Sequence, residues 1–172
     1  MVSQTYENRE LKVAVSKPRS RDWAMTDDEH SFRAPAHHPA KLVEIRRQPP
    51  GGGDRFAIIE LYVLELSPEA DEAAAARRLE RLGHTGEIGA FTLLSERVVS
   101  VGDRSMVRRV VLWDATGTKI ERQNPLAGKT KFLSLRARRD GKLYLLVAAT
   151  PARYFDELLP ELEQAFESFR VG

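Results

Sequence analysis

Cysteine is absent from this chain of 172 residues. Its absence excludes disulfide bonds, thiolate metal sites and a cysteine nucleophile. The sequence also lacks an uninterrupted run of about 18 apolar residues, so no segment is expected to span a membrane as a helix. The polar segment 1–9 lacks the apolar core of a signal peptide. The compartment stays open: the protein is cytoplasmic, or it lies outside the cytoplasm after losing a signal or anchor.

Neither sign of charge is in large excess, since 27 basic residues face 25 acidic ones. A dedicated nucleic-acid binder usually carries a dense basic face, so we expect no nucleic-acid partner. Hydrophobic residues make up 42% of the chain and charged residues 30%. These values are ordinary for a folded domain and too apolar for a disordered chain. Length and composition together predict a single domain over residues 1–172.

Alternating apolar and polar side chains predict strands along most of the chain. Before the midpoint we expect strands at Leu11–Val15, Lys41–Arg47 and Arg55–Leu66. Later strands are predicted at Phe91–Val101, Ser105–Asp114, Lys131–Arg139 and Lys142–Ala149. Asp140-Gly141 joins the last two and favours a type I′ turn. Trp23 is predicted to enter the core from a loop.

Two helices are predicted. The first begins with Ser67 as its N-cap and closes at Gly83. The second begins with Thr150 as its cap, and Pro160 is expected to kink or divide it. Its apolar face recurs at helical spacing through Leu158, Leu159, Leu162, Ala165, Phe166 and Phe169. Hairpin-linked strands with few helices predict an α+β fold, with an antiparallel sheet flanked by helices.

Residues near both ends resemble those of a known family. Pro18 and Trp23 follow the first predicted strand, and the chain closes with Glu167-Ser168-Phe169-Arg170 on an apolar helix. These features resemble the PsbP-like and DcrB-like domains, which include a photosystem II extrinsic protein, a Ran-binding import factor and bacterial lipoproteins. The resemblance implies an α/β/α sandwich whose members bind partners and share no catalytic residues. No functional residue of those proteins has a counterpart here.

The motifs that could carry chemistry are incomplete. Leu126–Thr130 resembles the end of a phosphate-binding loop, but Gln123 stands where the motif needs glycine, and a strand is predicted to follow. Gly51-Gly52-Gly53 precedes a strand and is expected to be a connecting loop. His30, His37 and His38 follow acidic residues, but adjacent histidines of an extended chain point to opposite sides. A solvated loop is therefore preferred to a metal site.

We expect no enzyme and no bound cofactor. The sequence has no Gly-x-Ser-x-Gly elbow. The carboxylate pairs Glu157 with Glu161 and Glu163 with Glu167 lie four residues apart on the polar face of the last helix. Such pairs are most simply surface charge.

One strand is predicted to present a basic face. Ser134, Arg136 and Arg138 alternate with apolar residues, so they share one side of a strand. A solvated sheet face is the default explanation of this pattern, and the other is a surface for an acidic protein, an anionic lipid surface or nucleic acid. The candidate partner surface comprises Lys129, Lys131, Ser134, Arg136, Arg138 and Arg108.

The function that these observations favour is protein binding or scaffolding without catalysis. The alternative is a domain that binds a small ligand or lipid in a cavity between the sheet and the C-terminal helix. A core filled by Leu158, Leu162, Phe166 and Trp113 would contradict that alternative.

Overall fold

A computed structural model describes residues 4–27, 39–48, 55–81, 88–123 and 128–172. Its main sheet has the strand order β3-β4-β5-β9-β8-β7-β6, and every neighbouring pair is antiparallel. The strands are β3 (Trp23–Asp27), β4 (Ala40–Arg47), β5 (Ala57–Glu65), β6 (Ala90–Val101), β7 (Arg104–Asp114), β8 (Lys129–Arg139) and β9 (Lys142–Pro151).

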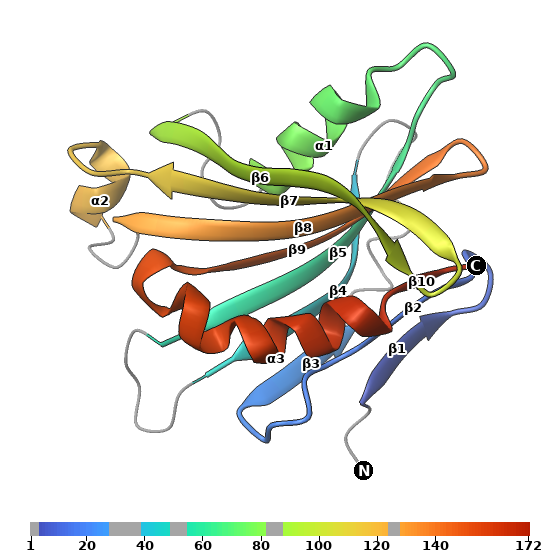
Figure 1. Cartoon of the computed structure of the whole chain (residues 1–172), viewed down its shortest axis with the longest axis horizontal. Coiled ribbons are helices and arrows are strands. Elements are labelled where there is room, and N and C mark those ends of the chain that lie inside the picture. Colours follow the sequence, from blue (N-terminus) through green and yellow to red (C-terminus); the bar gives the residue numbers. More distant parts are fainter. Residues whose placement is uncertain (1–3, 28–38, 49–54, 82–87, 124–127) are drawn as a thin grey trace.

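The helices lie on both faces of this sheet (Figure 1). They are α1 (Glu72–Arg81), α2 (Lys119–Gln123), the single 3-10 turn η3 (Ala152–Tyr154) and α3 (Phe155–Ser168). Helix α1 packs on one face, and α3 packs on the other. The structure therefore confirms the predicted α+β class and the α/β/α layering. Among the described residues, no helix has the length and apolar character needed to cross a membrane.

A second, small sheet joins the two ends of the chain. It contains β1 (Thr5–Asn8), β2 (Val13–Ser16) and β10 (Arg170–Val171), in the order β1-β2-β10. The predicted strand at Leu11–Val15 is correct only for its second half. The chain reverses before Val13, where Asn8 accepts a hydrogen bond from the Leu11 amide at 2.9 Å and Lys12 has φ 55°. Trp23 is buried as predicted, but it begins β3 rather than lying in a loop.

The core between the sheet and α3 is filled by side chains. Leu158, Leu162, Phe166 and Phe169 are all buried and pack in one cluster with residues of β4, β5, β8 and β9. The predicted apolar stripe of the last helix is thus confirmed. Trp113 is also buried, but on the opposite face, beside Phe132 and under α1. This packing argues against a ligand cavity between the sheet and α3.

Both predicted helix starts are wrong. Ser67 accepts a hydrogen bond from the Ala70 amide in a turn, and Asp71 instead caps α1 by accepting from the Ala74 amide at 3.1 Å. Thr150 lies in β9, where its hydroxyl donates to the Phe56 carbonyl at 2.8 Å. Strand β9 continues to Pro151 because β8 still pairs with it there. Gly83, the predicted end of the first helix, lies outside the described residues.

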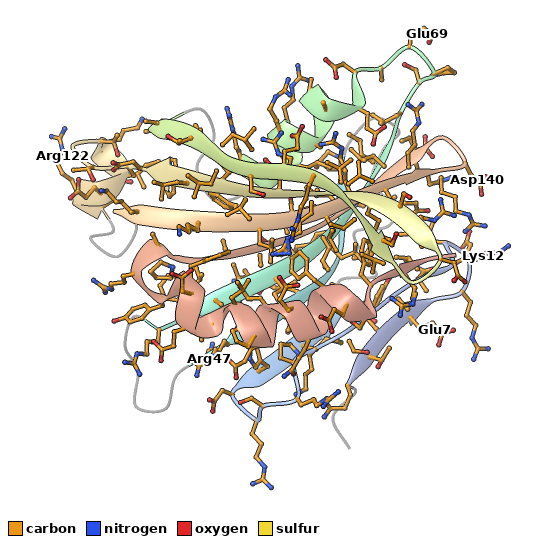
Figure 2. The ribbon with its side chains drawn as sticks, in the orientation of Figure 1. Glu7, Lys12, Arg47, Glu69, Arg122 and Asp140 are labelled. Atoms are coloured by element: carbon orange, nitrogen blue, oxygen red, sulfur yellow. The ribbon has the colours of Figure 1, made fainter. Side chains whose placement is uncertain are left out.

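Pro160 does not divide the last helix. It lies inside α3, and the irregular turn comes earlier, at η3. The hairpin prediction is confirmed, since Asp140 and Gly141 have φ of 51° and 74°, as a type I′ turn requires. Figure 2 shows Asp140 at this turn and Arg122 of α2 at the opposite end of the sheet.

Candidate functional site

The six residues of the predicted basic surface do not share one face of the sheet. Ser134, Arg136 and Arg138 point toward α1, the side of β8 that also carries Phe132. Arg108 and Lys131 point toward α3, where they meet Glu163 and Phe155. Lys129 is exposed at the start of β8. The structure therefore divides the set between two layers.

Helix α1 covers most of the predicted basic face. Ser134 is buried, and its hydroxyl donates to Glu80 Oε1 at 2.7 Å. The Arg136 side chain is only 10% exposed, and its Nε lies 3.4 Å from Glu72 Oε1. Arg138 donates to the Ser67 carbonyl at 3.1 Å. The expectation of a solvent-exposed basic face is thus wrong, because acidic residues at helical spacing, Glu72 and Glu80, dock α1 onto it.

The basic side chains on the other face hold α3 in place. Both terminal nitrogens of Arg108 donate to Glu163 Oε1, at 2.8 and 2.6 Å. The Lys131 ammonium lies 5.1 Å from the centre of the Phe155 ring. At the other side of α3, Arg47 pairs with Glu161 at 3.2 Å. These cations are engaged within the fold rather than presented to a partner.

A polar row crosses the main sheet on the α1 face. Cross-strand pairing aligns Thr26, Glu44, Glu60, Val147, Ser134, Arg109 and Glu96 from one edge to the other. Arg109 Nε lies 3.0 Å from Glu80 Oε1, and its Nη1 donates to Glu96 at 2.8 Å. Arg109 is therefore paired both with Glu96 of the row and with Glu80 of α1.

The acidic end of this row is neutralised by its neighbours. Lys41 Nζ lies 2.7 Å from Glu44 Oε2 and 3.6 Å from Glu60 Oε2, and the Tyr62 hydroxyl donates to Glu60 at 2.9 Å. Burial raises the pKa of Glu44, but hydrogen bonds from Arg46 and Lys41 outweigh it, and the net pKa is lowered. The described residues contain no group of three His, Asp or Glu side chains that could hold a metal ion. The histidines at 30, 37 and 38 lie outside the described residues, as do Gly51–Gly53.

Strand β6 forms an exposed edge of the main sheet. It is 12 residues long and pairs with β7 on one side. In the described part of the chain, no strand pairs with its other side. Leu93, Leu94 and Val98 are 52%, 46% and 70% exposed, and they are the exposed large hydrophobic side chains of the described residues. A long edge strand with apolar side chains is a ready template for another strand.

The residue pattern predicts this strand but not its place in the sheet. Residues 91–101 carry apolar side chains toward both faces, but Ser95, Glu96 and Arg97 interrupt them, and this mixture does not distinguish an edge strand from a central one. The exposure of the hydrophobic residues of β6 follows from its position at the edge of the sheet, so it could be predicted only from the strand order.

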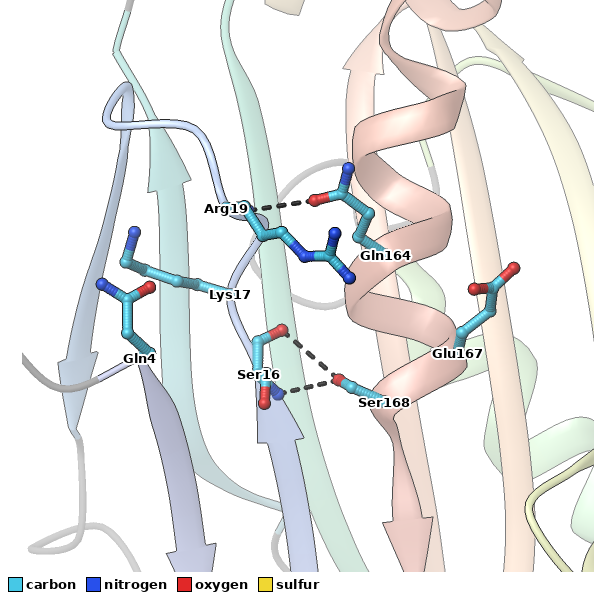
Figure 3. A pocket seen from close by; sticks show the side chains of 7 residues that line it. All are labelled: Gln4, Ser16, Lys17, Arg19, Gln164, Glu167 and Ser168. Carbon is cyan, nitrogen blue, oxygen red and sulfur yellow. Dashed lines mark hydrogen bonds between the residues drawn. The ribbon is translucent and has the colours of Figure 1, made fainter.

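A polar pocket lies beside the end of α3 (Figure 3), with a volume of about 650 Å³. Its lining residues are Gln4, Ser16, Lys17, Arg19, Gln164, Glu167 and Ser168. Lys17 is 7% exposed, and its ammonium donates to the Pro18 carbonyl at 3.4 Å. Ser168 accepts from the Ser16 amide at 2.8 Å, and the Arg19 amide donates to Gln164 at 3.0 Å. These hydrogen bonds fasten β2 and the segment after it to α3.

No protein-family model matches the sequence, and no curated protein matches it at a significant level. Solved structures share its fold at low sequence identity. Cyanobacterial PsbP (CyanoP) from Synechocystis sp. PCC 6803 matches with a TM-score of 0.59 and 12% identity, over 98% of this chain and 92% of that chain. LpqN of Mycobacterium tuberculosis, which is involved in cell envelope biogenesis, gives 0.56 and 13%, over 97% and 91%.

The yeast protein Mog1p belongs to the same group. This Ran-binding protein of Saccharomyces cerevisiae matches with a TM-score of 0.54 and 13% identity, over 99% of this chain and 96% of that chain. The chain therefore has the Mog1/PsbP-like fold, as the resemblance in its sequence implied. At these identities, the likeness establishes architecture and leaves the function to be argued from the chain's own surface.

Proposed function

We propose that this chain is a non-enzymatic protein-binding domain, a single unit over residues 1–172, whose partner surface is the outer edge of β6. The observation that carries the proposal is the clustering of Leu93, Leu94 and Val98 on one edge strand. Apolar side chains gathered at an exposed site mark interaction surfaces more often than scattered ones do. The backbone of the same strand offers hydrogen bonds to an incoming strand.

The alternatives have less support from the described residues. The buried charges on the α1 face are paired within the fold, which suits a structural network better than an acid–base site. The space between the sheet and α3 is filled by Leu162 and Phe166. That a fold neighbour, Mog1p, is a Ran-binding protein supports protein binding as a use of this architecture.

Site-specific photocrosslinking in the native host tests the proposal. A photoreactive phenylalanine analogue placed at Leu93 or Val98 is expected to give a discrete protein adduct. The same analogue at exposed Glu69, which lies away from β6 in Figure 2, is the matched control and should give none. Adding Val98→Glu to the Leu93 crosslinker should remove the adduct, because it places a charge on the apolar edge. Equal adducts from all positions, or none from β6, would refute the assignment of β6.

A further inference from the structure

We infer that the strand that pairs with β6 is β6 of a second copy of this chain, in antiparallel alignment across a twofold axis at Val98. This inference rests on the proposed function, since it names the partner for the same edge. The main sheets of the two copies would become one continuous sheet. Three features support this pairing: the outward hydrogen-bonding groups of β6, its charge register, and the apolar strip beside Val98.

The turn after β6 determines which backbone groups point outward. Val101 pairs with Arg104, so only Gly102 and Asp103 connect β6 to β7. Residues that flank a two-residue turn form a hydrogen-bonded pair, and such pairs alternate along an antiparallel ladder. Val101, Val99 and Arg97 therefore direct their backbone groups toward β7. Ser100, Val98 and Glu96 direct their N–H and C=O groups outward, where a second strand can reach them.

Twofold symmetry restricts the register because one residue must lie opposite its own copy. We call the residue that lies opposite its own copy the centre of the register. A centre at Glu96 or Arg97 would place identical charges directly opposite each other, which destabilises cross-strand pairs. A centre at Ser100 would pair Val98 with the turn residue Gly102. A centre at Val98 avoids both problems. It places Val98 opposite itself with outward backbone groups on both strands, and it places Glu96 opposite the Ser100 of the second copy.

This register also covers the most exposed apolar side chain. Val98 is 70% exposed, and its cross-strand neighbour on the same face is the half-buried Val107 of β7. Pairing at Val98 would create a strip of four valines, with Val107 and Val98 from each copy. Glu96 already pairs with Arg109 at 2.8 Å, so an uncharged serine opposite it leaves no unpaired carboxylate.

The lack of native cysteine allows a direct test of the register. In a hydrogen-bonded antiparallel pair the Cα atoms are about 5.5 Å apart, which a disulfide bond can span. Val98→Cys is therefore expected to form a covalent dimer under mild oxidation, seen on non-reducing gels. Leu94→Cys is the matched control, because it is also exposed on β6. In this register the two Leu94 residues of a dimer would lie eight residues apart along the strand direction, about 27 Å. Leu94→Cys should therefore form the covalent dimer far more slowly than Val98→Cys.

A pair of charge variants provides a second test. Ser100→Lys would face Glu96 of the other copy, and Ser100→Glu would repel it. Because each contact occurs twice, we expect the dimer dissociation constant to fall about 2- to 30-fold for Ser100→Lys and to rise by a similar factor for Ser100→Glu. Sedimentation equilibrium over a range of protein concentrations measures both.

The outcomes separate this inference from the proposed function. Three results would each overturn self-pairing. They are equal crosslinking of Val98→Cys and Leu94→Cys, a chain that stays monomeric at every concentration, and dissociation constants that shift in the same direction for the two Ser100 variants. If β6 photocrosslinks to a different protein while the chain stays monomeric, protein binding stands and the second copy is wrong. If β6 captures neither a second copy nor another protein, both are wrong.

Discussion

Arg109 of β7 and Glu80 of α1 form an ion pair at 3.0 Å, and both residues are buried. Ser134 donates to the same Glu80 oxygen at 2.7 Å. These contacts join α1 to β7 and β8 of the main sheet. Besides Glu80, the buried residues of α1 are Ala76 and Leu79, so charge pairing adds to a small apolar contact.

Removal of one partner should therefore be strongly destabilising. Glu80→Met leaves the buried Arg109 with Glu96 alone, and breaking a buried pair in this way costs about 3–5 kcal/mol. The double variant Glu80→Met with Arg109→Met should be less destabilised than the sum of the single variants, because no charge is left unpaired. Urea unfolding followed by circular dichroism measures both effects.

The matched control for Glu80 is exposed Glu69, just before the same helix. Glu69→Gln should change the unfolding free energy by no more than about 0.5 kcal/mol. Additive losses in the Glu80 and Arg109 single and double variants would show that the two residues do not act as a pair.

Glu44 should give the protein a component of stability that acid removes. Its pKa is lowered in the fold, because Arg46 and Lys41 outweigh the opposite effect of burial. Because the pKa of Glu44 is lowered in the fold, the unfolded chain binds more protons than the folded chain in this pH range. The stabilisation by Glu44 is therefore present above its ordinary pKa near 4.5 and is lost as pH falls below that value. Glu44→Gln should be less stable than the native chain at neutral pH.

The pH dependence of that difference is the measurement. Unfolding free energies of the native chain and Glu44→Gln should converge as pH falls from about 7 to about 3. Glu69→Gln should instead track the native chain across this range. A constant gap between the native chain and Glu44→Gln would contradict the assignment of the ion pairs.

The strands of the second half of the chain could be predicted because their signals are local. The Asp140-Gly141 turn and the alternation on either side of it depend on a few neighbouring residues. Thr150 suits a helix cap locally, but the pairing of β9 with β8 keeps it in the sheet, so tertiary pairing overrode a local preference. The start of α1 was missed for a local reason, because Ser67 lies in a turn and Asp71, four residues later, caps the helix instead.

The site was harder to predict because it depends on strand order and helix placement. Arg136 and Ser134 do share one face, as alternation predicted, but α1 covers that face through Glu72 and Glu80. Val98 lies in a strand that was predicted correctly, yet its exposure follows from the position of β6 at the edge. Neither fact is present in any short stretch of sequence.

The packing of α3 should make its apolar face essential for stability. Leu162→Ala is expected to cost about 2–5 kcal/mol and Phe166→Ala about 3–5 kcal/mol, because each leaves a cavity in a filled core. Leu94→Ala, an exposed control on β6, should stay within about 0.5 kcal/mol of the native chain. Small losses for the α3 variants would indicate that their side chains line an open space, as the ligand-binding alternative requires.

Two glycines with positive φ should respond differently to alanine. Gly117 has φ 80°, and a Cβ at this position would meet no atom within 4 Å. Gly117→Ala should therefore cost about 1–2 kcal/mol from backbone strain alone. Gly89 has φ 97°, and a Cβ there would lie 2.4 Å from Trp113 Nε1 and 2.8 Å from the Asp114 carbonyl oxygen.

Gly89→Ala must therefore displace Trp113 as well as strain the backbone. The Trp113 indole donates to the Ile88 carbonyl at 2.8 Å, and this hydrogen bond should be lost. We expect a cost larger than that of Gly117→Ala by about 1–3 kcal/mol, together with a change in tryptophan fluorescence that Gly117→Ala does not produce. Equal losses for the two variants would show that backbone conformation alone, and not the close approach of Trp113, requires glycine at position 89.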